Sequence, residues 1–188
     1  MINDIYFQKF PQLESERLIF REIMMSDASD IQNIRTDKNV MKYMDSNPHS
    51  TLQDSKSFIS KNIETYTKGN GLFWAIIEKS TNTFIGDFAY WKILIENHRA
   101  EIGYTLKPQF WGKGFMKETM VELIKFGFTH LNLHSIEANV NPENESSKKL
   151  LYRVGFRKEG YFKENYYFDG KYLDSEIFSL LEVDFKYS

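Results

Sequence analysis

The chain contains no cysteine among its 188 residues, which excludes disulfide bonds, thiolate metal sites and any covalent cysteine intermediate. It also lacks a long apolar run, because no stretch approaches the length of a membrane span. The first six residues contain no basic region followed by an apolar run, so they lack the pattern of a secretory signal. We therefore expect a cytoplasmic protein without membrane contact.

A strong charge of one sign is absent as well. The chain has 24 basic and 26 acidic side chains, a net charge of -2, and no block of like charges. This balance predicts no direct binding to nucleic acid. His130 and His134 are four residues apart, but the glutamate of the H-E-x-x-H zinc motif is missing between them, so we expect no metal.

Only four prolines interrupt the chain, and it contains no internal repeat, low-complexity tract or linker. These properties predict one domain over residues 1–188. Apolar periodicity predicts strands at 18–22, 72–78, 84–93, 100–106, 135–141, 157–168 and 174–182, and helices at 27–37, 53–67, 114–131 and 144–153. Strands in series, followed by a strand-helix-strand unit, predict a mixed α/β fold whose sheet is covered on both faces.

The segment from Pro108 to Glu118 joins a predicted strand to a predicted helix through Gly112 and Gly114. The helix start offers unpaired N–H groups and the positive end of a dipole, and glycines leave no Cβ to block a pyrophosphate. The dinucleotide fingerprint fails because Lys117 stands at its third glycine, and the P-loop pattern occurs nowhere. Ordinary turns also use glycine, so this segment alone leaves a phosphate site and a plain turn both open.

A second segment, 139–156, follows the predicted strand at 135 and reads NVNPENESSKKLLYRVGF. Together with the loop at 108–118, LESERL at 13–18 and AEIGY at 100–104, it resembles the GNAT family of acetyl-CoA-dependent N-acetyltransferases, within it the RimJ/RimL branch of ribosomal-protein N-terminal acetyltransferases. The likeness extends from about Leu13 to Asp184. It implies the GNAT fold, a mostly antiparallel twisted sheet of six to seven strands that splays at the acetyl-CoA site, with helices on both faces. It also implies acetyl-CoA as co-substrate, and self-association as a homodimer.

The family loop reads Q/R-x-x-G-x-G/A, and residues 109–114 match it letter for letter. Pro108 and the following helix nevertheless favour another register, which places Trp111 at the Gln/Arg position, Gly114 at the central glycine and Met116 at the last small position. The chain then departs from the motif at two of three places. Since such loops bind phosphate with backbone N–H groups, we expect the pyrophosphate beside the Trp111 ring, on the amides of Gly112, Lys113, Gly114, Phe115 and Met116.

Two further residues are expected to contact the pantetheine arm by resemblance. Asn144 aligns with a family residue that binds this arm, while its local pattern, three residues before Ser147, equally predicts a helix N-cap. The side chain of Leu106 is expected in the core. The resemblance implies that its backbone binds pantetheine and the thioester carbonyl as an added strand would.

The catalytic candidates are Glu101 and Ser147. Strand alternation places Glu101 on one face with Gly103 and Thr105, where a carboxylate in a partly dry cleft could take a proton from the amine, directly or through water. The alternative is an exposed strand carboxylate that pairs with Arg99 or Lys92. The resemblance to RimL-like enzymes favours Ser147 as a donor to the departing thiolate, although a serine in a first helical turn is also ordinary.

Two positions depart from the family pattern. Many members have a tyrosine seven residues after the asparagine that aligns with Asn144, where this chain has Leu151; Tyr152 follows it, turned by about 100° on a helix, so we expect it in packing or at the surface. Tyr166 replaces a glutamate of RimL-like enzymes. The Lys/Glu alternation around Glu118 predicts a solvated helix face.

The leading interpretation is direct transfer of acetyl from the thioester to a primary amine, above all a protein N-terminal α-amino group. A small-amine acetyltransferase of polyamine or aminoglycoside type would use the same cofactor residues. A non-catalytic acyl-CoA-binding module, or a structural domain that binds nothing, would show the same fold. The acceptor surface is expected from helices within 27–67 and the hairpin at 161–171.

Overall fold

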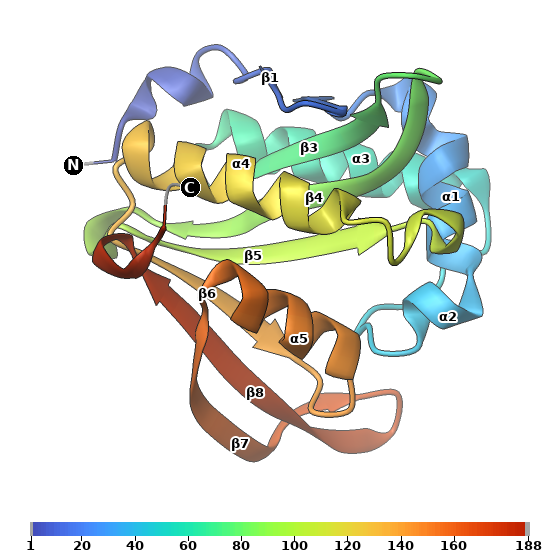
Figure 1. Ribbon diagram of the computed structural model, residues 1–188. Coiled ribbons are helices and arrows are strands. Elements are labelled where there is room, and N and C mark those ends of the chain that lie inside the picture. Colours follow the sequence, from blue (N-terminus) through green and yellow to red (C-terminus); the bar gives the residue numbers. More distant parts are fainter. Residues whose placement is uncertain (1, 187–188) are drawn as a thin grey trace.

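Eight strands form one sheet in the order β1-β2-β3-β4-β5-β6-β8-β7 in the computed structural model, which describes residues 2–186 (Figure 1). The strands are β1 (Leu13–Glu14), β2 (Leu18–Glu22), β3 (Leu72–Glu78), β4 (Thr83–Leu94), β5 (Arg99–Leu106), β6 (Ser135–Val140), β7 (Arg157–Phe168) and β8 (Lys171–Leu181). The helices are α1 (Ala28–Thr36), α2 (Lys38–Met41), α3 (Leu52–Thr67), α4 (Phe115–Thr129) and α5 (Glu145–Val154). Short 3-10 turns are η1 (Asp4–Phe7), η2 (Met25–Asp27), η3 (Ile95–Asn97), η4 (Pro108–Phe110) and η5 (Glu182–Asp184).

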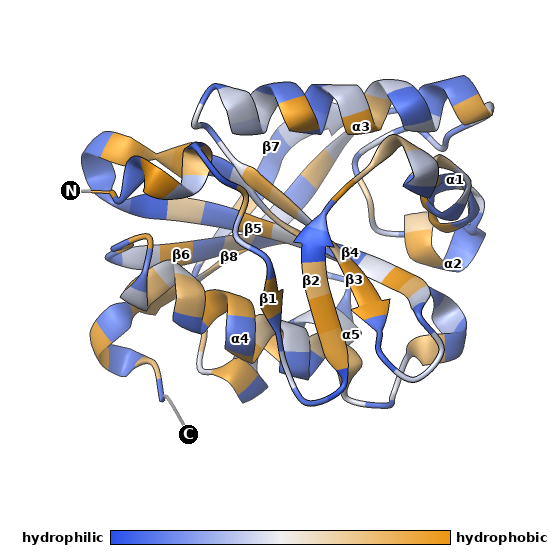
Figure 2. Cartoon of the chain, turned by 90° about the horizontal axis from the view of Figure 1, so that it is seen from above, coloured by the Kyte–Doolittle hydropathy of each residue, from blue (hydrophilic) through white to orange (hydrophobic). Residues whose placement is uncertain are grey.

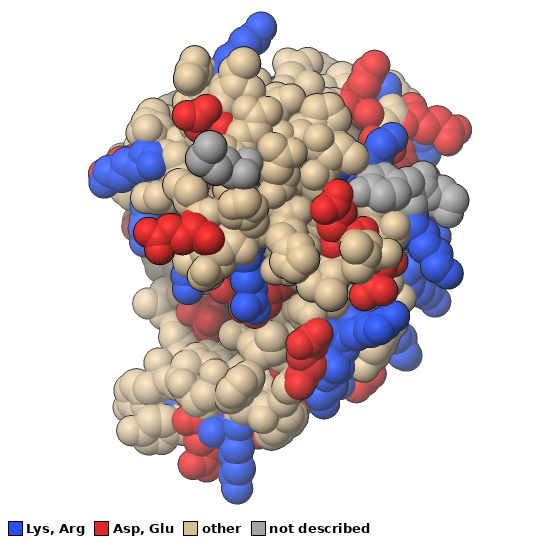
Figure 3. All heavy atoms as spheres, turned by 90° about the vertical axis from the view of Figure 1, so that its left-hand side faces the viewer, with Lys and Arg blue, Asp and Glu red and all other residues tan. Residues whose placement is uncertain are grey.

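Helices cover both faces of the sheet. Figure 2 shows α1, α2 and α3 on one face, and α4 and α5 on the other. All neighbouring strands are antiparallel except β5 and β6, which are parallel and are joined through α4. No helix within residues 2–186 is long and apolar enough to span a membrane. Figure 3 shows acidic and basic side chains interspersed on the face that it presents.

The core lies mostly between the sheet and α4. This helix buries Met120, Leu123 and Ile124, which recur at helical spacing. Trp74 is fully buried, and its indole N–H donates to the Pro11 carbonyl at 2.8 Å. Tyr90 is also fully buried, and its hydroxyl donates to the Leu123 carbonyl at 2.7 Å. Because each large aromatic residue satisfies its polar atom, the sheet and α4 are joined without a buried unpaired donor at these rings.

The parallel pair β5 and β6 separates along its length. Their ladder runs only from Arg99, opposite Ser135, to Glu101, opposite Glu137. Beyond Glu101, β5 continues to Leu106 while it pairs with β4 alone, and β6 continues to Val140 while it pairs with β8 alone. The two strands therefore form a V that opens after Glu101 and leaves backbone groups along its inner edges without strand partners.

Most of the predicted elements are confirmed, and β2, β3 and β7 coincide with their predicted ranges. The expected six to seven strands become eight because the two-residue β1 pairs with β2. The helix predicted at 27–37 ends at Thr36, since Asp37 turns to extended backbone and its carboxylate caps α2. Strand β8 begins at Lys171, three residues before its predicted start, because Asp169 and Gly170 both have positive φ and close a two-residue hairpin.

Candidate active site

The loop before α4 presents a set of unpaired donors. Gly112 and Gly114 have φ values of +73° and +81°, and a Cβ on Gly112 would meet nothing within 4 Å. Within residues 2–186, no protein group accepts a hydrogen bond from the backbone N–H groups of residues 112–116. Several such donors at the start of a 15-residue helix are what an anionic diphosphate requires. The chemistry of this loop therefore fits the pyrophosphate of acetyl-CoA.

The side chains of the same loop are directed elsewhere. Phe115 and Met116 are buried in the core, so only their backbones can face a ligand. The indole N–H of Trp111 donates to the Leu106 carbonyl at 2.7 Å, and 46% of Trp111 is exposed. Lys113 is exposed, with its ammonium 5.5 Å from the centre of the Phe110 ring. The loop thus offers amides and one aromatic surface.

Arg17 holds the loop, a role that sequence reasoning missed although the residue lies in the LESERL segment. Its guanidinium donates to the Lys113 carbonyl at 3.1 Å, forms an ion pair with Glu118 at 2.7 Å and lies 4.3 Å from the centre of the Phe115 ring. Glu118 also accepts from the Ser15 hydroxyl at 2.7 Å. The prediction of a solvated face is therefore wrong for Glu118, whose carboxylate is partly buried against β1 and β2.

The balance of contacts fixes the charge of Glu118. Burial tends to raise its pKa, but the hydrogen bonds from Ser15 and Arg17 and the positive charge of Arg17 outweigh this effect, so the pKa lies below its ordinary value. Glu118 is thus an ionised side chain at the start of α4. Arg17 neutralises it, which keeps this negative charge from repelling a bound phosphate.

Asn144 is an N-cap, as predicted. Its side-chain oxygen accepts from the Ser147 backbone N–H at 3.1 Å and from the Ser146 hydroxyl at 2.9 Å. Its amide nitrogen donates to no group within the described chain, so it remains available to a ligand. Leu106 buries its side chain in the core, as expected, and lies on the strand that borders the V.

Ser147 contacts a residue that the sequence did not single out. Its hydroxyl and that of Tyr104 lie 2.7 Å apart, which joins the first turn of α5 to β5. Burial raises the pKa of Tyr104 to about 12, against a smaller lowering by Ser147, so the phenol keeps its proton at neutral pH. Alternation along β5 would have placed Tyr104 on the α5 face, but its partner is 43 residues away in the chain.

Glu101 lies on the opposite face of β5, at the point where the V opens. It lines a small pocket of about 130 Å³ with Lys92, Arg99 and Glu137. Arg99 forms its ion pair with Glu137, and no ion pair within residues 2–186 includes Glu101. Burial raises its pKa; Asp45 raises it further, while Lys92 and Arg99 lower it. The alternative of an ion-paired strand carboxylate is therefore not found.

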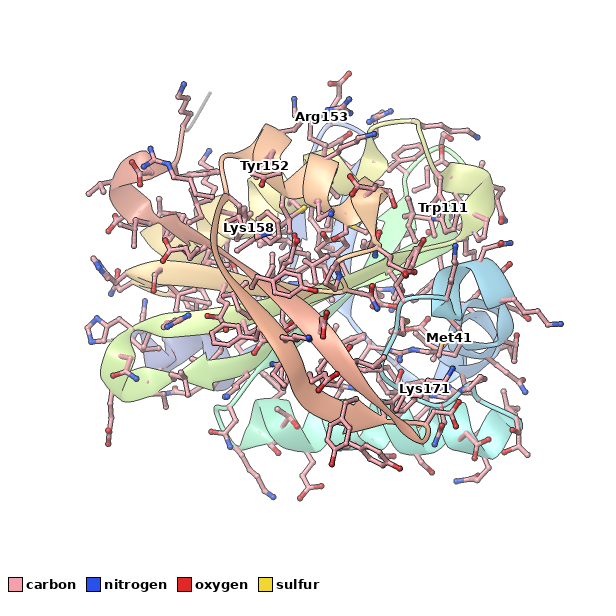
Figure 4. The ribbon with its side chains drawn as sticks, turned by 90° about the horizontal axis from the view of Figure 1, so that it is seen from below. Met41, Trp111, Tyr152, Arg153, Lys158 and Lys171 are labelled. Atoms are coloured by element: carbon pink, nitrogen blue, oxygen red, sulfur yellow. The ribbon has the colours of Figure 1, made fainter. Side chains whose placement is uncertain are left out.

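Tyr152 is 54% exposed, and its ring packs edge-on against Phe178 at 5.3 Å. Figure 4 shows it on α5, away from Trp111. This position corresponds to the packing or surface role that the sequence predicts. No group of three or more His, Asp or Glu residues within 2–186 is arranged to hold a metal ion. His130 instead stacks on Phe126, with ring centres 5.4 Å apart.

A larger cleft opens between the α2 region and the β7–β8 hairpin. It has a volume of about 530 Å³ and is walled by residues of 41–48 on one side and 166–173 on the other, with Asn141 between them. Figure 4 shows Met41 and Lys171, from the two walls, on the side of the molecule that also carries Trp111. Tyr166, which stands where RimL-like enzymes have a glutamate, is one of the lining residues.

Comparison with known proteins agrees with this geometry. The chain belongs to the GNAT family of acetyltransferases, because residues 17–157 match the model of the acetyltransferase (GNAT) domain. It is an N-acetyltransferase, and acetyl-CoA is its co-substrate. Membership in the family, which the sequence predicted, is thus confirmed.

Three proteins illustrate the range of N-acetyltransferases to which the chain is similar. The uncharacterized N-acetyltransferase p20 of Bacillus licheniformis is 38% identical, over 92% of this chain and 97% of its own length. The spermidine N(1)-acetyltransferase of Vibrio cholerae is 25% identical, over 78% of this chain and 82% of its own. Among solved structures, a ribosomal-protein-S5-alanine acetyltransferase from Vibrio fischeri superimposes with a TM-score of 0.81 and 28% identity, over 94% of this chain and 99% of its own. The last two are named for different acceptors, spermidine and the alanine of a ribosomal protein, and p20 is uncharacterized, so these relatives do not determine the acceptor of this chain.

Proposed function

We propose that the chain acetylates the N-terminal α-amino group of a protein or peptide. The observation that carries this proposal is the cleft between residues 41–48 and the β7–β8 hairpin. Its lining combines apolar side chains such as Met44 and Phe168 with polar ones such as Asn141, and contains one carboxylate, Asp169. A peptide end, with a backbone and mixed side chains, matches such a lining better than a polyamine, which requires several carboxylates.

The donor half of the proposed site lies at α4 and α5. Acetyl-CoA supplies a thioester whose carbonyl carbon an uncharged amine can attack. The amides of residues 112–116 would hold its pyrophosphate, and the Asn144 amide group together with the inner edge of β5 would bind the pantetheine arm. Arg17 keeps the loop in place through Lys113 and Glu118.

The reacting groups would come from the two faces of β5. Glu101 takes the proton from the incoming ammonium, directly or through one water, so that the amine gains a lone pair. The Ser147 hydroxyl donates a hydrogen bond to the departing sulfur, and the Tyr104 hydroxyl donates to Ser147 in turn. Acid and base functions thus stay on opposite sides of one strand.

Incubation of the purified protein with labelled acetyl-CoA tests the proposal. Peptides with free α-amino groups, spermidine and an aminoglycoside would be offered separately, and products would be identified by mass spectrometry. We expect acetyl on peptide α-amino groups. Turnover confined to spermidine or the aminoglycoside would replace the proposal with the small-amine alternative. The predicted homodimer would be measured on the same sample by light scattering.

A further inference from the structure

The lining of the proposed acceptor cleft contains two cations, Lys42 and Lys171. Lys42 lies on the α2 wall and Lys171 on the hairpin wall, and both are exposed. No ion pair within residues 2–186 includes either ammonium. Lys42 instead lies 4.8 Å from the centre of the Tyr43 ring. Asp169 is the one carboxylate among the described lining residues, so cations outnumber anions in the lining; the charge of Glu143, outside the lining, also acts on Lys42.

Asp45 adds a negative charge beside the cleft. Asp45 follows the α2 wall, and its carboxylate acts on the pKa of both Tyr166, which lines the cleft, and Glu101, at the opening of the V. Asp45 is exposed and stands between Met44 and Ser46, which line the cleft. Arg35 and Asp87 are both buried, and the charges of Asp87 and Asp45 each act on Arg35. Negative charge therefore acts at Glu101, where the amine must react, and positive charge predominates in the cleft lining.

From this polarity we infer that the enzyme prefers peptides with an acidic side chain within the first few positions after the N-terminus, and that Lys42 and Lys171 bind this side chain. The inference rests on the proposed function. The N-terminal ammonium would lie near Glu101, and the acidic side chain at Lys42 and Lys171. Carboxylates form hydrogen bonds to ammonium groups, so the pair also fixes the direction of the peptide.

The same polarity argues against a polycation. A polyamine places positive charges along its whole length, so its far end would meet Lys42 and Lys171. Like charges repel each other, and this repulsion lowers affinity without any steric clash. The two lysines therefore serve selectivity in two ways, through attraction of one acceptor class and rejection of another.

Three ten-residue peptides test the inference. They share a serine at position 1 and differ at positions 2 to 4, which are acidic, neutral amide or basic. We expect kcat/KM for the acidic peptide to exceed that for the neutral peptide about fivefold at low salt, as two exposed charge pairs would give, and the basic peptide to react most slowly. The ratio should approach one as salt is raised, because exposed charges are screened.

Substitutions of the two lysines test whether they cause the preference for the acidic peptide. In the Lys42→Gln, Lys171→Gln double variant, the ratio of kcat/KM between the acidic and the neutral peptide should fall to about one. The Lys42→Glu, Lys171→Glu variant should prefer the basic peptide. A matched control removes two exposed lysines of α3, in Lys56→Gln, Lys61→Gln, and should keep the full preference. All these positions lie on the surface, so folding is preserved.

Two results would overturn the inference while the proposed function stands. One is equal kcat/KM for all three peptides in the unmodified protein. The other is a preference for the acidic peptide that survives in the Lys42→Gln, Lys171→Gln variant. Acetylation of spermidine with no reaction of any peptide would instead defeat the proposed function itself, so the two failures are distinct.

Discussion

The hydroxyl groups of Tyr104 and Ser147 lie 2.7 Å apart and join β5 to the first turn of α5. One comes from the strand that borders the V and the other from the helix that Asn144 caps. Because burial raises the pKa of Tyr104 to about 12, the phenol stays protonated and can donate to Ser147. Ser147 then has its own proton free for a developing thiolate.

Removal of either hydroxyl should slow the chemical step. We expect Ser147→Ala to lower kcat about 10-fold or more, as the loss of a hydrogen bond to a charged group would give, and Tyr104→Phe to lower it by a smaller factor. The double variant should be no worse than Ser147→Ala, since Tyr104 acts through Ser147. Steady-state kcat at saturating acetyl-CoA measures this. Unchanged kcat in both single variants would remove the proposed role.

Glu101→Gln should remove the base and leave the fold intact. We expect kcat/KM to fall about 100-fold, and the acidic limb of its pH profile to vanish. Asp54→Asn, which alters a carboxylate in the N-terminal capping box of α3, is a control that should keep both the limb and the rate. A pH profile that keeps its acidic limb in Glu101→Gln would contradict this role.

The same substitution has a second, opposite effect on stability. Burial raises the pKa of folded Glu101 above the unfolded value of 4.5, so the folded state holds its proton more tightly. The stability that the folded state gains from this tighter proton binding is fully present below pH 4.5, and it is lost as pH rises through the folded pKa. At pH 7 the ionised carboxylate therefore costs stability, and we expect the Tm of Glu101→Gln to equal or exceed that of the unmodified protein. A lower Tm at pH 7 would contradict the burial of this group.

Alanine substitutions at the loop glycines distinguish a loss of acetyl-CoA binding from a general effect of backbone strain. Alanine at Gly112, Gly114 or Gly69 would occupy the left-handed region in each case, which costs roughly 1 to 2 kcal/mol of stability. Only the loop variants should raise KM for acetyl-CoA, about 10-fold, since an added Cβ at residue 112 or 114 obstructs the anion. Gly69→Ala is the matched control, because its Cβ would meet only the Phe7 ring at 3.8 Å. Equal KM values in all three variants would refute a phosphate site here.

The fifth prediction concerns Arg17 and Glu118. Arg17→Gln leaves the Glu118 charge beside the start of α4, so we expect KM for acetyl-CoA to rise about fivefold, more at low salt. The Arg17→Gln, Glu118→Gln double variant removes that charge as well and should recover part of the loss. Double-mutant analysis of KM measures the coupling. A double variant worse than Arg17→Gln would show that Glu118 does not repel the donor.

Local patterns in the sequence predicted most elements because their apolar periods are clear. Strand β3 is buried almost throughout and reads as a continuous apolar run, and α4 repeats Met120, Leu123 and Ile124 on one face. The loop glycines and the Asn144 cap were also evident, since turns and caps depend on neighbouring residues. The helix end at Asp37 was predicted within one residue, but the short helix α2 that Asp37 caps was missed, because an aspartate fits a helix end and a helix start equally well.

The parts of the fold and of the candidate site that the sequence did not predict depend on residues far apart in the chain. Arg17 meets Glu118 across 101 positions, and Tyr104 meets Ser147 across 43. The local periodicity of apolar residues gives no information about such contacts. The sequence of neither strand predicts the point where β5 and β6 separate. The alternation of buried and exposed residues in β6 continues to Val140, although its ladder with β5 ends at Glu101. The acceptor cleft combines two segments more than a hundred residues apart, so its charges could not be read together from the sequence.

The hydrogen bond from Trp111 to the Leu106 carbonyl gives the protein an optical reporter. The chain has three tryptophans: Trp74 is fully buried, while Trp91 and Trp111 are about half exposed. With Trp91 replaced by phenylalanine, the change in indole emission on addition of coenzyme A would arise at Trp111, against the constant signal of Trp74. Occupancy of the loop could then be followed in real time, without a label and without turnover.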